Sequence, residues 1–277
     1  MSNGSSNGAG PMVPTIHRVV GRRTDLADTT TLTLRPVDEA LPRPRPGQFN
    51  MLLVPGIGEV PISLAGLEDD DLVHTIRNVG AVTNALCSLA SGDFVGVRGP
   101  FGTGWDMAQA RGRDVLVVAG GLGIVPLRPV VEALVAQRAS YGKVAVVIGN
   151  RSPETMLYPE HVERWAKSVA VEVTVDAAKP DWSGHIGVVT EMLPAVKTDP
   201  AKQVAFVCGP EVMMRFAAEA IIDRGTPSDD VFVSIERNMH CAIGHCGRCQ
   251  VGPMFVCKEG PVVPWGRVDP ILKARGR

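Results

Sequence analysis

Four of the six cysteines stand close together near the C-terminus, at Cys241, Cys246, Cys249 and Cys257. Four, two and seven residues separate them in turn. The first three have the C-x4-C-x2-C spacing of plant-type 2Fe–2S sites, in which a fourth cysteine lies further along the chain. In a reducing compartment such a group favours metal binding over disulfide formation. The spacing therefore predicts a 2Fe–2S cluster held by four thiolates.

The residues between these cysteines fit a loop that wraps closely around a metal centre. Gly244 and Gly247 permit close backbone approach and positive φ angles. Four thiolates would also satisfy a structural zinc ion, although zinc ribbons pair two CxxC knuckles and this stretch contains one. His240 and His245 could replace a ligand, but with four cysteines present we expect them to be neighbours of the site.

A glycine-rich turn at 120–123 is a second place where residue types suggest chemistry. It follows the apolar stretch VLVVA and leads into a helical pattern with Pro126 in its first turn. Backbone amides at such a helix start suit the pyrophosphate of a dinucleotide. The pattern GGxGxxP differs from the Rossmann GxGxxG, and a tight strand–helix turn needs glycine even without a ligand. The turn therefore carries weight only together with its surroundings.

Cys208 ends a second apolar stretch, QVAFVC, and Gly209 and Pro210 follow before the next helical pattern. Ligands of open α/β sheets bind outside the carboxyl ends of the strands. A lone buried cysteine usually acts as a small apolar side chain. At this position it is also a candidate to lie against a nicotinamide ring.

Two different patterns must position these residues. From residue 14 to about 105, apolar and polar residues alternate between turn signals, which predicts a small antiparallel β-barrel with one short helix starting at Thr83. After residue 114, continuous apolar stretches alternate with helical ones, which predicts a doubly wound α/β domain with a parallel sheet. From Arg237 onward Gly and Cys are too frequent for a separate apolar core, so this segment needs a metal to hold its shape.

These patterns divide the 277 residues into four parts. We expect a disordered tail at 1–12, the barrel at 13–110, the α/β domain at 111–235 and a small cluster-binding segment at 236–277. A net charge of −1 and 5% aromatic residues give no reason to expect nucleic acid. Apolar stretches fall short of the ~18 residues of a membrane span, and the N-terminus lacks the features of a signal peptide. We therefore expect a cytoplasmic protein without membrane insertion.

The motifs along residues 14 to 235 resemble, in their order, the ferredoxin–NADP reductase superfamily. They are PGQF at 46–49, PIS at 61–63, RNVGAVTNAL at 77–86, GDFVGVRGPFG at 92–102, GGLGIVP at 120–126, GNRSPETMLY at 149–158 and CGPEVMM at 208–214. The resemblance implies an FAD-binding barrel paired with a nicotinamide-binding α/β domain, and oxidoreductase activity.

The resemblance also implies which residues contact the cofactors. Those expected at FAD are Pro61, Ile62 and Ser63 for the ring, and Arg77, Gly80 and Thr83 for the pyrophosphate. Those expected at NAD(P) are Gly121, Gly123, Pro126, Gly209, Glu211 and, beside the reacting nicotinamide as the catalytic residue, Cys208.

Two positions leave the resemblance incomplete. The family usually has an arginine two residues before the residue that contacts the flavin ring. In this chain that position is Val60, and Glu59 precedes it. In the segment where the family reads the 2′-phosphate, Asp176 would repel it and favour NAD, whereas Arg151 and Lys179 would attract it. The choice between NAD and NADP stays open.

The cysteine segment narrows the resemblance to one branch of the family. This branch contains the electron-transfer subunits of dihydroorotate dehydrogenase and of sulfite reductase, and the gamma (diaphorase) subunit of cytoplasmic NiFe hydrogenases. The segments GEVPIS and LCSLASGDFVGVRGPFGTGW are most similar to the hydrogenase protein. The resemblance implies electron transfer between NAD(P)(H), FAD and the cluster, with the iron–sulfur and catalytic subunits of a larger complex as partners. The alternatives are an electron-transfer subunit of dihydroorotate dehydrogenase or sulfite reductase, a free-standing reductase, and a non-redox zinc-binding module.

Six apolar residues flank the cysteines and have two interpretations. They would form a docking face for the partner, or they would pack against the α/β domain of the same chain. They are Met239, Met254, Phe255, Val262, Val263 and Trp265.

Overall fold

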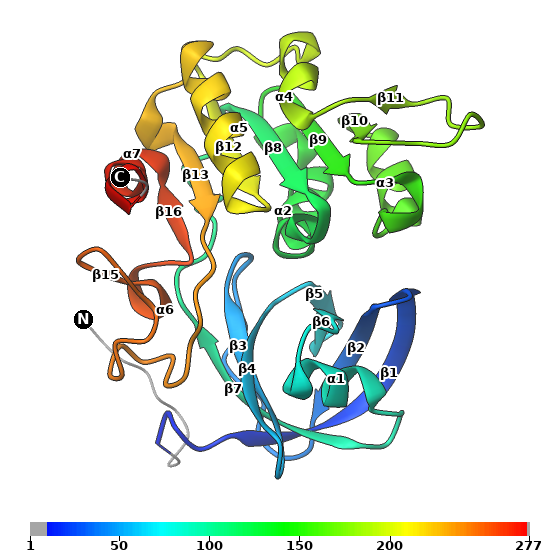
Figure 1. The fold of residues 1–277 in the computed structure, drawn as a ribbon, viewed down its shortest axis with the longest axis vertical. Helices are drawn as coiled ribbons and strands as arrows, with labels where there is room; N and C mark the ends of the chain where they lie inside the picture. Colours follow the sequence, from blue (N-terminus) through cyan, green and yellow to red (C-terminus); the bar gives the residue numbers. More distant parts are fainter. Residues whose placement is uncertain (1–9, 276–277) are drawn as a thin grey trace.

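The computed structural model describes residues 10–275, which fold around two large sheets (Figure 1). One sheet takes its strands from Thr15 to Phe101, and the other takes them from Asp114 onward. The tail predicted at 1–12 lies mostly outside the described residues. Among residues 10–275, no helix is both long enough and apolar enough to cross a bilayer.

The first sheet is antiparallel and runs in the order β4-β3-β7-β1-β2-β6-β5. Its strands are β1 (Thr15–Leu26), β2 (Thr29–Pro36), β3 (Phe49–Val54), β4 (Gly58–Ser63), β5 (Gly66–Glu68), β6 (Asp71–Arg77) and β7 (Phe94–Phe101). Leu32, Leu34 and Leu52 lie in its core, which Leu86 of helix α1 (Ala81–Ser88) helps to close. The alternating pattern of the sequence thus forms the antiparallel domain that it predicts.

Helix α1 begins two residues earlier than the sequence suggested. Gly80 is its N-cap, and Thr83 lies within the first turn. The Thr83 hydroxyl accepts hydrogen bonds from the backbone N–H groups of Val79 and Gly80 at 3.0 and 2.9 Å. Thr83 lies inside the helix but accepts hydrogen bonds from the turn that precedes it. For this reason its sequence pattern resembled that of an N-cap residue.

The second sheet runs in the order β11-β10-β9-β8-β12-β13-β16 and is parallel except for β16. Its strands are β8 (Asp114–Gly120), β9 (Val144–Asn150), β10 (Ala170–Val175), β11 (His185–Ile186), β12 (Gln203–Cys208), β13 (Val231–Ser234) and β16 (Val262–Pro264). The helices between them are α2 (Ile124–Ala136), α3 (Pro159–Ala166), α4 (Val189–Met192) and α5 (Glu211–Asp223).

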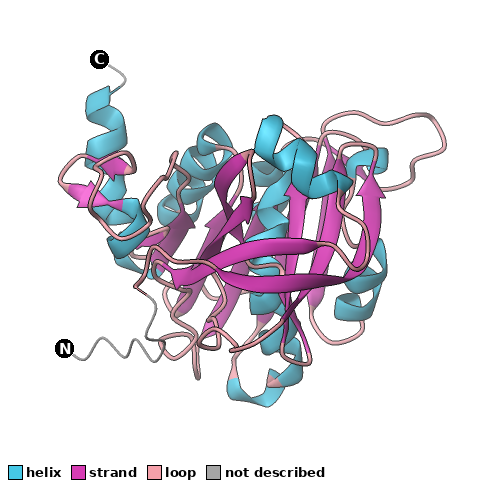
Figure 2. Cartoon of the chain, turned by 90° about the horizontal axis from the view of Figure 1, so that it is seen from below, coloured by secondary structure: helices cyan, strands magenta, loops and turns pink. Residues whose placement is uncertain are grey.

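Helices cover both faces of this sheet (Figure 2). Successive side chains of a strand point to opposite faces. In β8, Val115 and Val117 pack in the cluster of buried residues that contains α2, whereas Leu116 and Val118 pack in the one that contains α5. This two-sided burial explains the unbroken apolar runs in the sequence.

The strand order reverses between β8 and β12. The chain moves outward from β8 through β9 and β10, and then returns to place β12 on the other side of β8. In open α/β sheets, ligands bind beyond the carboxyl ends of the strands at this reversal. The turns that follow β8 and β12 therefore occupy the position at which a dinucleotide is expected.

The C-terminal segment packs on the α/β domain instead of forming a core of its own. It contains a short hairpin, β14 (Gln250–Val251) and β15 (Met254–Phe255), followed by α6 (Val256–Glu259), β16 and α7 (Trp265–Arg275). Strand β16 joins the edge of the second sheet, where Val263 pairs with Val233 of β13. Helix α7 forms the last part of the segment expected at 236–277.

A buried polar contact joins the two domains. The Tyr158 hydroxyl of the α/β domain donates to Thr75 Oγ1 of β6 at 2.6 Å, and Thr75 Oγ1 lies 2.6 Å from Thr31 Oγ1. The Arg128 guanidinium of α2 lies over the Tyr158 ring, 5.1 Å from its centroid. These contacts fix the carboxyl ends of the parallel strands beside the antiparallel sheet.

Candidate functional site

The four predicted ligands lie as two pairs of cysteines. The Cys246 side chain helps to lower the pKa of the Cys241 thiol, and the Cys249 side chain helps to raise the pKa of the Cys257 thiol. A 2Fe–2S cluster has two irons and four protein ligands, so two ligand pairs fit it. Within residues 10–275, no group of three or more metal-binding side chains converges on one position for a single ion.

Backbone N–H groups point at the sulfur of the first cysteine. Those of Ile243, His245 and Cys246 donate to Cys241 Sγ at 3.5, 3.3 and 3.4 Å. Burial opposes ionisation of this thiol, but the three N–H groups and the Cys246 side chain together outweigh it and lower the pKa of Cys241 below its ordinary value. This loop is therefore arranged to hold a thiolate, which is the form that binds a metal.

Glycines give the loop its path. Gly244 and Gly247 have φ of +75° and +74°, where side chains with a Cβ are strained. The Gly244 N–H donates to Cys257 Sγ at 3.1 Å. Burial and the neighbouring Cys249 raise the pKa of Cys257, so this thiol needs the charge of a metal to ionise. The donor set thus fits a bound cluster.

The residues around the cysteines divide into exposed and buried ones. His240 and His245 are exposed, as expected for neighbours of the site. Five of the six flanking apolar residues are buried in the core shared with the α/β domain, and only Phe255 is half-buried. The interpretation of this set as a docking face is therefore wrong for the other five, because their surface is already covered by their own chain.

The glycine-rich turn after β8 touches the turn after β12. A Cβ on Gly123 would lie 2.2 Å from the Cys208 carbonyl oxygen and 2.7 Å from the Gly209 nitrogen. A Cβ on Gly209 would in turn lie 3.1 Å from the Gly120 Cα. Gly121 has φ of +52°, and Pro126 is buried in the first turn of α2. The structure therefore brings both glycine motifs together at the reversal of strand order.

Cys208 ends β12 at this contact and is 3% exposed. Burial raises the pKa of its thiol to about 12, and the nearby Glu236 carboxylate acts in the same direction. The side chain is therefore a neutral thiol at physiological pH. It can pack against a ligand, but it is not a nucleophile.

Strand β4 carries the three residues expected at the flavin ring, and all six of its residues are half-buried. Beneath it lies a histidine that the sequence analysis missed. His74 is fully buried, and its Nδ1 donates to the Ser63 carbonyl at 2.9 Å while Nε2 accepts from Asn50 Nδ2 at 3.1 Å. Burial lowers the pKa of His74 to about 4, so the ring is neutral and fixes the end of β4. Its only sequence signal was a polar residue amid buried neighbours in DLVHTIR.

Asn50 also carries an unsatisfied atom. Its Oδ1 is buried and has no hydrogen-bond partner among residues 10–275. Buried acceptors without a partner are rare in native proteins. This oxygen lies against Gly99 of β7, so that position is a place where a bound group or water is expected to supply a donor.

The start of α1 presents an open helix N-terminus. Gly80 is exposed and, being glycine, supplies no side-chain cap, and the first turn contains no acidic residue. The Thr83 hydroxyl takes the N–H groups of Val79 and Gly80. Such an end suits a pyrophosphate. Arg77 lies nearby at the end of β6, but it pairs with Asp28 through an Nε–Oδ2 contact of 2.8 Å. This pair is exposed to solvent, so Arg77 and the backbone around Gly80 are both candidates for the anion site.

The residues expected around the nucleotide ribose lie at one edge of the second sheet. Arg151 follows β9 and Asp176 follows β10, and Val175 and Asn150 pair directly before them. Both are exposed. Lys179, which we expected to attract a phosphate, lies 3.1 Å from a Glu154 carboxylate oxygen.

Glu211 begins α5, directly after the turn that contains Gly209. Its side chain is 58% exposed, and its carboxylate lies 3.5 Å from Arg237. It therefore stands at the same sheet edge as Cys208, on the side from which the cluster-binding segment leaves the domain.

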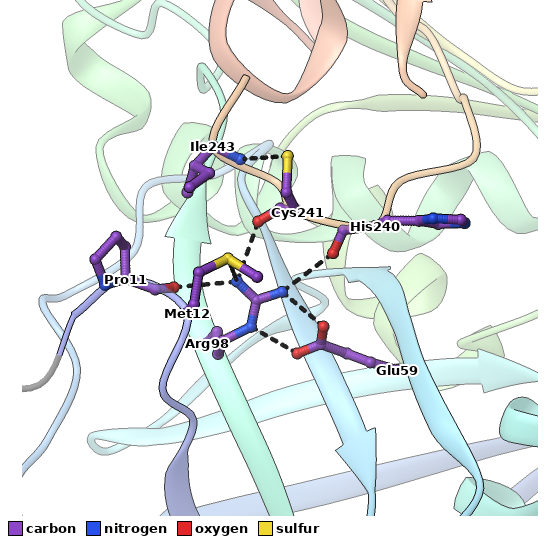
Figure 3. Close-up of polar contacts among 7 residues, drawn as sticks. All are labelled: Pro11, Met12, Glu59, Arg98, His240, Cys241 and Ile243. Carbon is purple, nitrogen blue, oxygen red and sulfur yellow. Dashed lines mark hydrogen bonds and ion pairs between the residues drawn. The ribbon is translucent and has the colours of Figure 1, made fainter. Parts of the chain in front are cut away.

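Arg98 and Glu59 form a second feature that sequence reasoning missed (Figure 3). Two parallel contacts of 2.7 and 2.6 Å join the Arg98 guanidinium in β7 to the Glu59 carboxylate in β4. The same guanidinium donates to the backbone carbonyl of Cys241 at 3.1 Å. Their separations of 39 and 143 positions in the chain explain why no local pattern indicated these contacts.

Two family models match the chain. Residues 117–219 match the oxidoreductase NAD-binding domain, and residues 236–269 match the iron–sulfur cluster binding domain of dihydroorotate dehydrogenase B. A chain of the NADH-dependent reduced ferredoxin–NADP oxidoreductase has the same fold, with a TM-score of 0.73 and 24% identity over 96% of this chain and 94% of that one. The fold and site thus define an oxidoreductase with an NAD-binding domain and an iron–sulfur cluster binding domain.

Curated relatives place the chain within this class. The sulfhydrogenase 1 gamma subunit of Pyrococcus furiosus is 35% identical over 228 residues, which cover 79% of this chain and 78% of the relative. The probable dihydroorotate dehydrogenase B electron transfer subunit of the same organism is 35% identical over 217 residues, which cover 78% of each. The chain belongs to the family that includes both of these subunits.

Proposed function

We propose that this chain is the nicotinamide-facing (diaphorase) subunit of a cytoplasmic NiFe hydrogenase. The observation that carries the electron-transfer role is the cysteine loop, in which N–H groups donate to the Cys241 sulfur. This loop is hydrogen-bonded to β7, which pairs with β3 in the antiparallel sheet. The sulfhydrogenase gamma relatives support the hydrogenase assignment. Equal identity to an electron transfer protein of dihydroorotate dehydrogenase B supports that complex as the second candidate.

Each group of site residues has a part in this proposal. Pro61, Ile62 and Ser63 line the flavin ring, and His74 fixes the strand that carries them. Gly80 and Thr83 shape the helix start for the FAD pyrophosphate. FAD, when bound, supplies the conversion between a two-electron hydride transfer and single-electron transfers.

The α/β domain holds the nicotinamide dinucleotide in this proposal. Gly121, Gly123 and Pro126 offer backbone for the pyrophosphate at the start of α2. Cys208, at the end of β12, gives the nicotinamide ring a neutral, polarizable surface. Gly209 and Glu211 border the same position, so that the ring is held between this turn and the flavin-lining strand.

Cys208→Ala should slow the anaerobic bleaching of FAD by NADH or NADPH and leave FAD content unchanged. The reason is that Cys208 lies at the end of β12, outside the antiparallel sheet that binds the flavin. The measurement is stopped-flow absorbance, with FAD quantified after release. Bleaching at the wild-type rate, or a purified protein that contains FMN, would remove the role given to Cys208.

Asp176→Ser should shift the preference between nucleotides toward NADPH. Asp176 is exposed at the end of β10, where a carboxylate repels a 2′-phosphate. The measurement is the ratio of kcat/KM for NADPH to that for NADH with a dye acceptor. Lys179→Ser tests the opposite charge. It should lower the same ratio if Lys179 leaves its ion pair with Glu154 and binds the 2′-phosphate. An unchanged ratio in Asp176→Ser would show that this carboxylate does not select the nucleotide.

Purification from the native host tests the complex itself. A hydrogenase role predicts co-purification of a large subunit that contains nickel and a small iron–sulfur subunit. Recovery of a dihydroorotate dehydrogenase catalytic chain or a sirohaem protein would instead assign the chain to a neighbouring branch. A stable monomer without partners would indicate a free-standing reductase.

A further inference from the structure

The Arg98 guanidinium is buried, with only 2% of its side chain exposed, and it is held on every side. Nε and Nη2 donate to the two Glu59 oxygens. Nη1 donates to the Pro11 carbonyl at 3.0 Å, and the centroid of the Phe101 ring lies 5.5 Å from the guanidinium carbon. A buried cation with these contacts has one geometry, because moving it would leave its charge and donors unpaired.

The remaining donors of Arg98 reach the cluster-binding loop. Nη1 donates to the carbonyl of Cys241, the first predicted ligand, and Nη2 donates to the carbonyl of His240 at 3.3 Å. Arg98 thus holds the backbone of Cys241, a predicted cluster ligand, and of the residue before it (Figure 3). The sulfur of Cys241 stays free for its own N–H donors.

Glu59 connects this arrangement to the flavin side. It lies in β4, two residues before Pro61, the first residue expected to line the ring. The path from flavin-lining strand to cluster ligand therefore consists of one carboxylate, one guanidinium and one backbone carbonyl. Glu59 precedes the place where the family usually has its arginine, so this chain has a different charged residue near that position.

A second contact holds the far end of the cluster-binding segment but does not involve a ligand. The Thr103 N–H donates to the Gly260 carbonyl at 2.6 Å, and its hydroxyl donates to the Val262 carbonyl at 2.8 Å. The segment is thus attached at both ends. Only the Arg98 end acts on a residue that binds the cluster.

We propose that Arg98 and Glu59 are positioning residues for electron transfer, which hold the Cys241 end of the cluster-binding loop at a fixed place against the flavin-lining strand. This inference rests on the proposed function, since it assumes FAD on one side and the cluster on the other. Electron transfer falls steeply with distance, so a loop that moves would slow transfer to the cluster without affecting hydride transfer to the flavin.

The test compares Arg98→Met and Arg98→Lys with wild type in the full chain loaded with cofactors. Stopped-flow bleaching reports flavin reduction, and rapid-freeze EPR reports cluster reduction. Hydrogen exchange of amides 240–246 reports loop opening. Arg98→Met should reduce the cluster several-fold more slowly at unchanged bleaching, and loop exchange should rise about tenfold or more. Arg98→Lys keeps the positive charge but loses the two-pronged contact with Glu59. It should therefore recover part of the rate of cluster reduction and part of the protection of the loop amides.

Arg113→Met is the matched control. Arg113 also forms a two-pronged pair with a carboxylate, Asp230, at 2.8 and 2.7 Å, and also donates to two backbone carbonyls. It lies in the α/β domain, away from the loop. Its variant should leave the ratio of the two rates and the exchange of 240–246 unchanged.

Two outcomes would overturn the inference. One is that Arg98→Met reduces the cluster, and exchanges amides 240–246, at the wild-type rates. The other is that Arg113→Met slows cluster reduction and raises this exchange as much as Arg98→Met does. If Arg98→Met does not fold, the same two measurements on Arg98→Lys and Glu59→Gln decide the question, because both variants nearly keep the volume of the buried pair. Wild-type rates in both would then overturn the inference. A wild-type protein without iron would contradict the proposed function, whereas loop exchange in the variants would still decide whether Arg98 holds the loop.

Discussion

Cys257→Ser is expected to remove most of the iron and acid-labile sulfide from the purified protein and to leave FAD content near that of wild type. Wild type should contain about two irons and two sulfides per chain. A hydroxyl is a far weaker ligand than a thiolate, and Cys257 belongs to one of the two pairs. The flavin should persist because its sheet has a core of its own. Iron, sulfide and FAD assays on one preparation give the answer.

Cys87→Ser is the control for this substitution. Cys87 is half-buried in α1, and its Sγ donates to the Ile76 carbonyl at 3.5 Å, far from the cysteine loop in the sequence. Its variant should keep full iron and sulfide. One zinc per chain without sulfide in wild type would contradict the 2Fe–2S assignment and return the zinc-binding module as the better interpretation.

Gly123→Ala is expected to have the second large effect, on stability and on nucleotide binding together. The new Cβ would lie 2.2 Å from the Cys208 carbonyl oxygen, which belongs to the backbone and cannot rotate away. The turns after β8 and β12 would have to separate, at a cost on the order of 3 kcal/mol in the free energy of unfolding. Denaturant titration measures this loss. If the protein still folds, bleaching by NADH should require a much higher nucleotide concentration.

Gly112→Ala separates backbone strain from this steric contact. Gly112 has φ of +73°, but no atom lies within 4 Å of the position of its Cβ. Its variant should lose about 1 kcal/mol through the left-handed conformation alone and should bind nucleotide as wild type does. Equal losses in the two variants would show that the contact with Cys208 is not what makes glycine necessary at 123.

Features that depend on neighbouring residues could be predicted from the sequence. The cysteine spacing and the two glycine-rich turns are local patterns, and the unbroken apolar stretches indicated strands buried on both faces. The order of these stretches also placed Cys208 and Gly123 at the same sheet edge, since the carboxyl ends of parallel strands share an edge. Because both turns are tight, their backbones come into contact at this edge.

Features that depend on distant pairs could not be predicted in this way. Arg98 and Glu59 each resemble an ordinary charged residue of a half-exposed strand, and only the three-dimensional arrangement shows that they face each other and Cys241. The apolar residues around the cysteines had two interpretations for the same reason. Sequence shows that Val263 and Trp265 must be covered, but not that their own sheet covers them.

The position of β16 means that the cluster-binding segment is not a detachable module. Strand β13 is fully buried, and β16 is its neighbour on the outer side. A protein shortened before Val262 would leave the N–H and C=O groups of β13 as an open edge, which is a template for association with other chains. Shortened forms that retain only the flavin and nicotinamide domains would therefore be expected to aggregate unless charged residues or a bulge protect this edge. Loss of the whole segment from this fold would therefore have required a change in the sheet edge, whereas loss of the four cysteines alone would leave β16 in place.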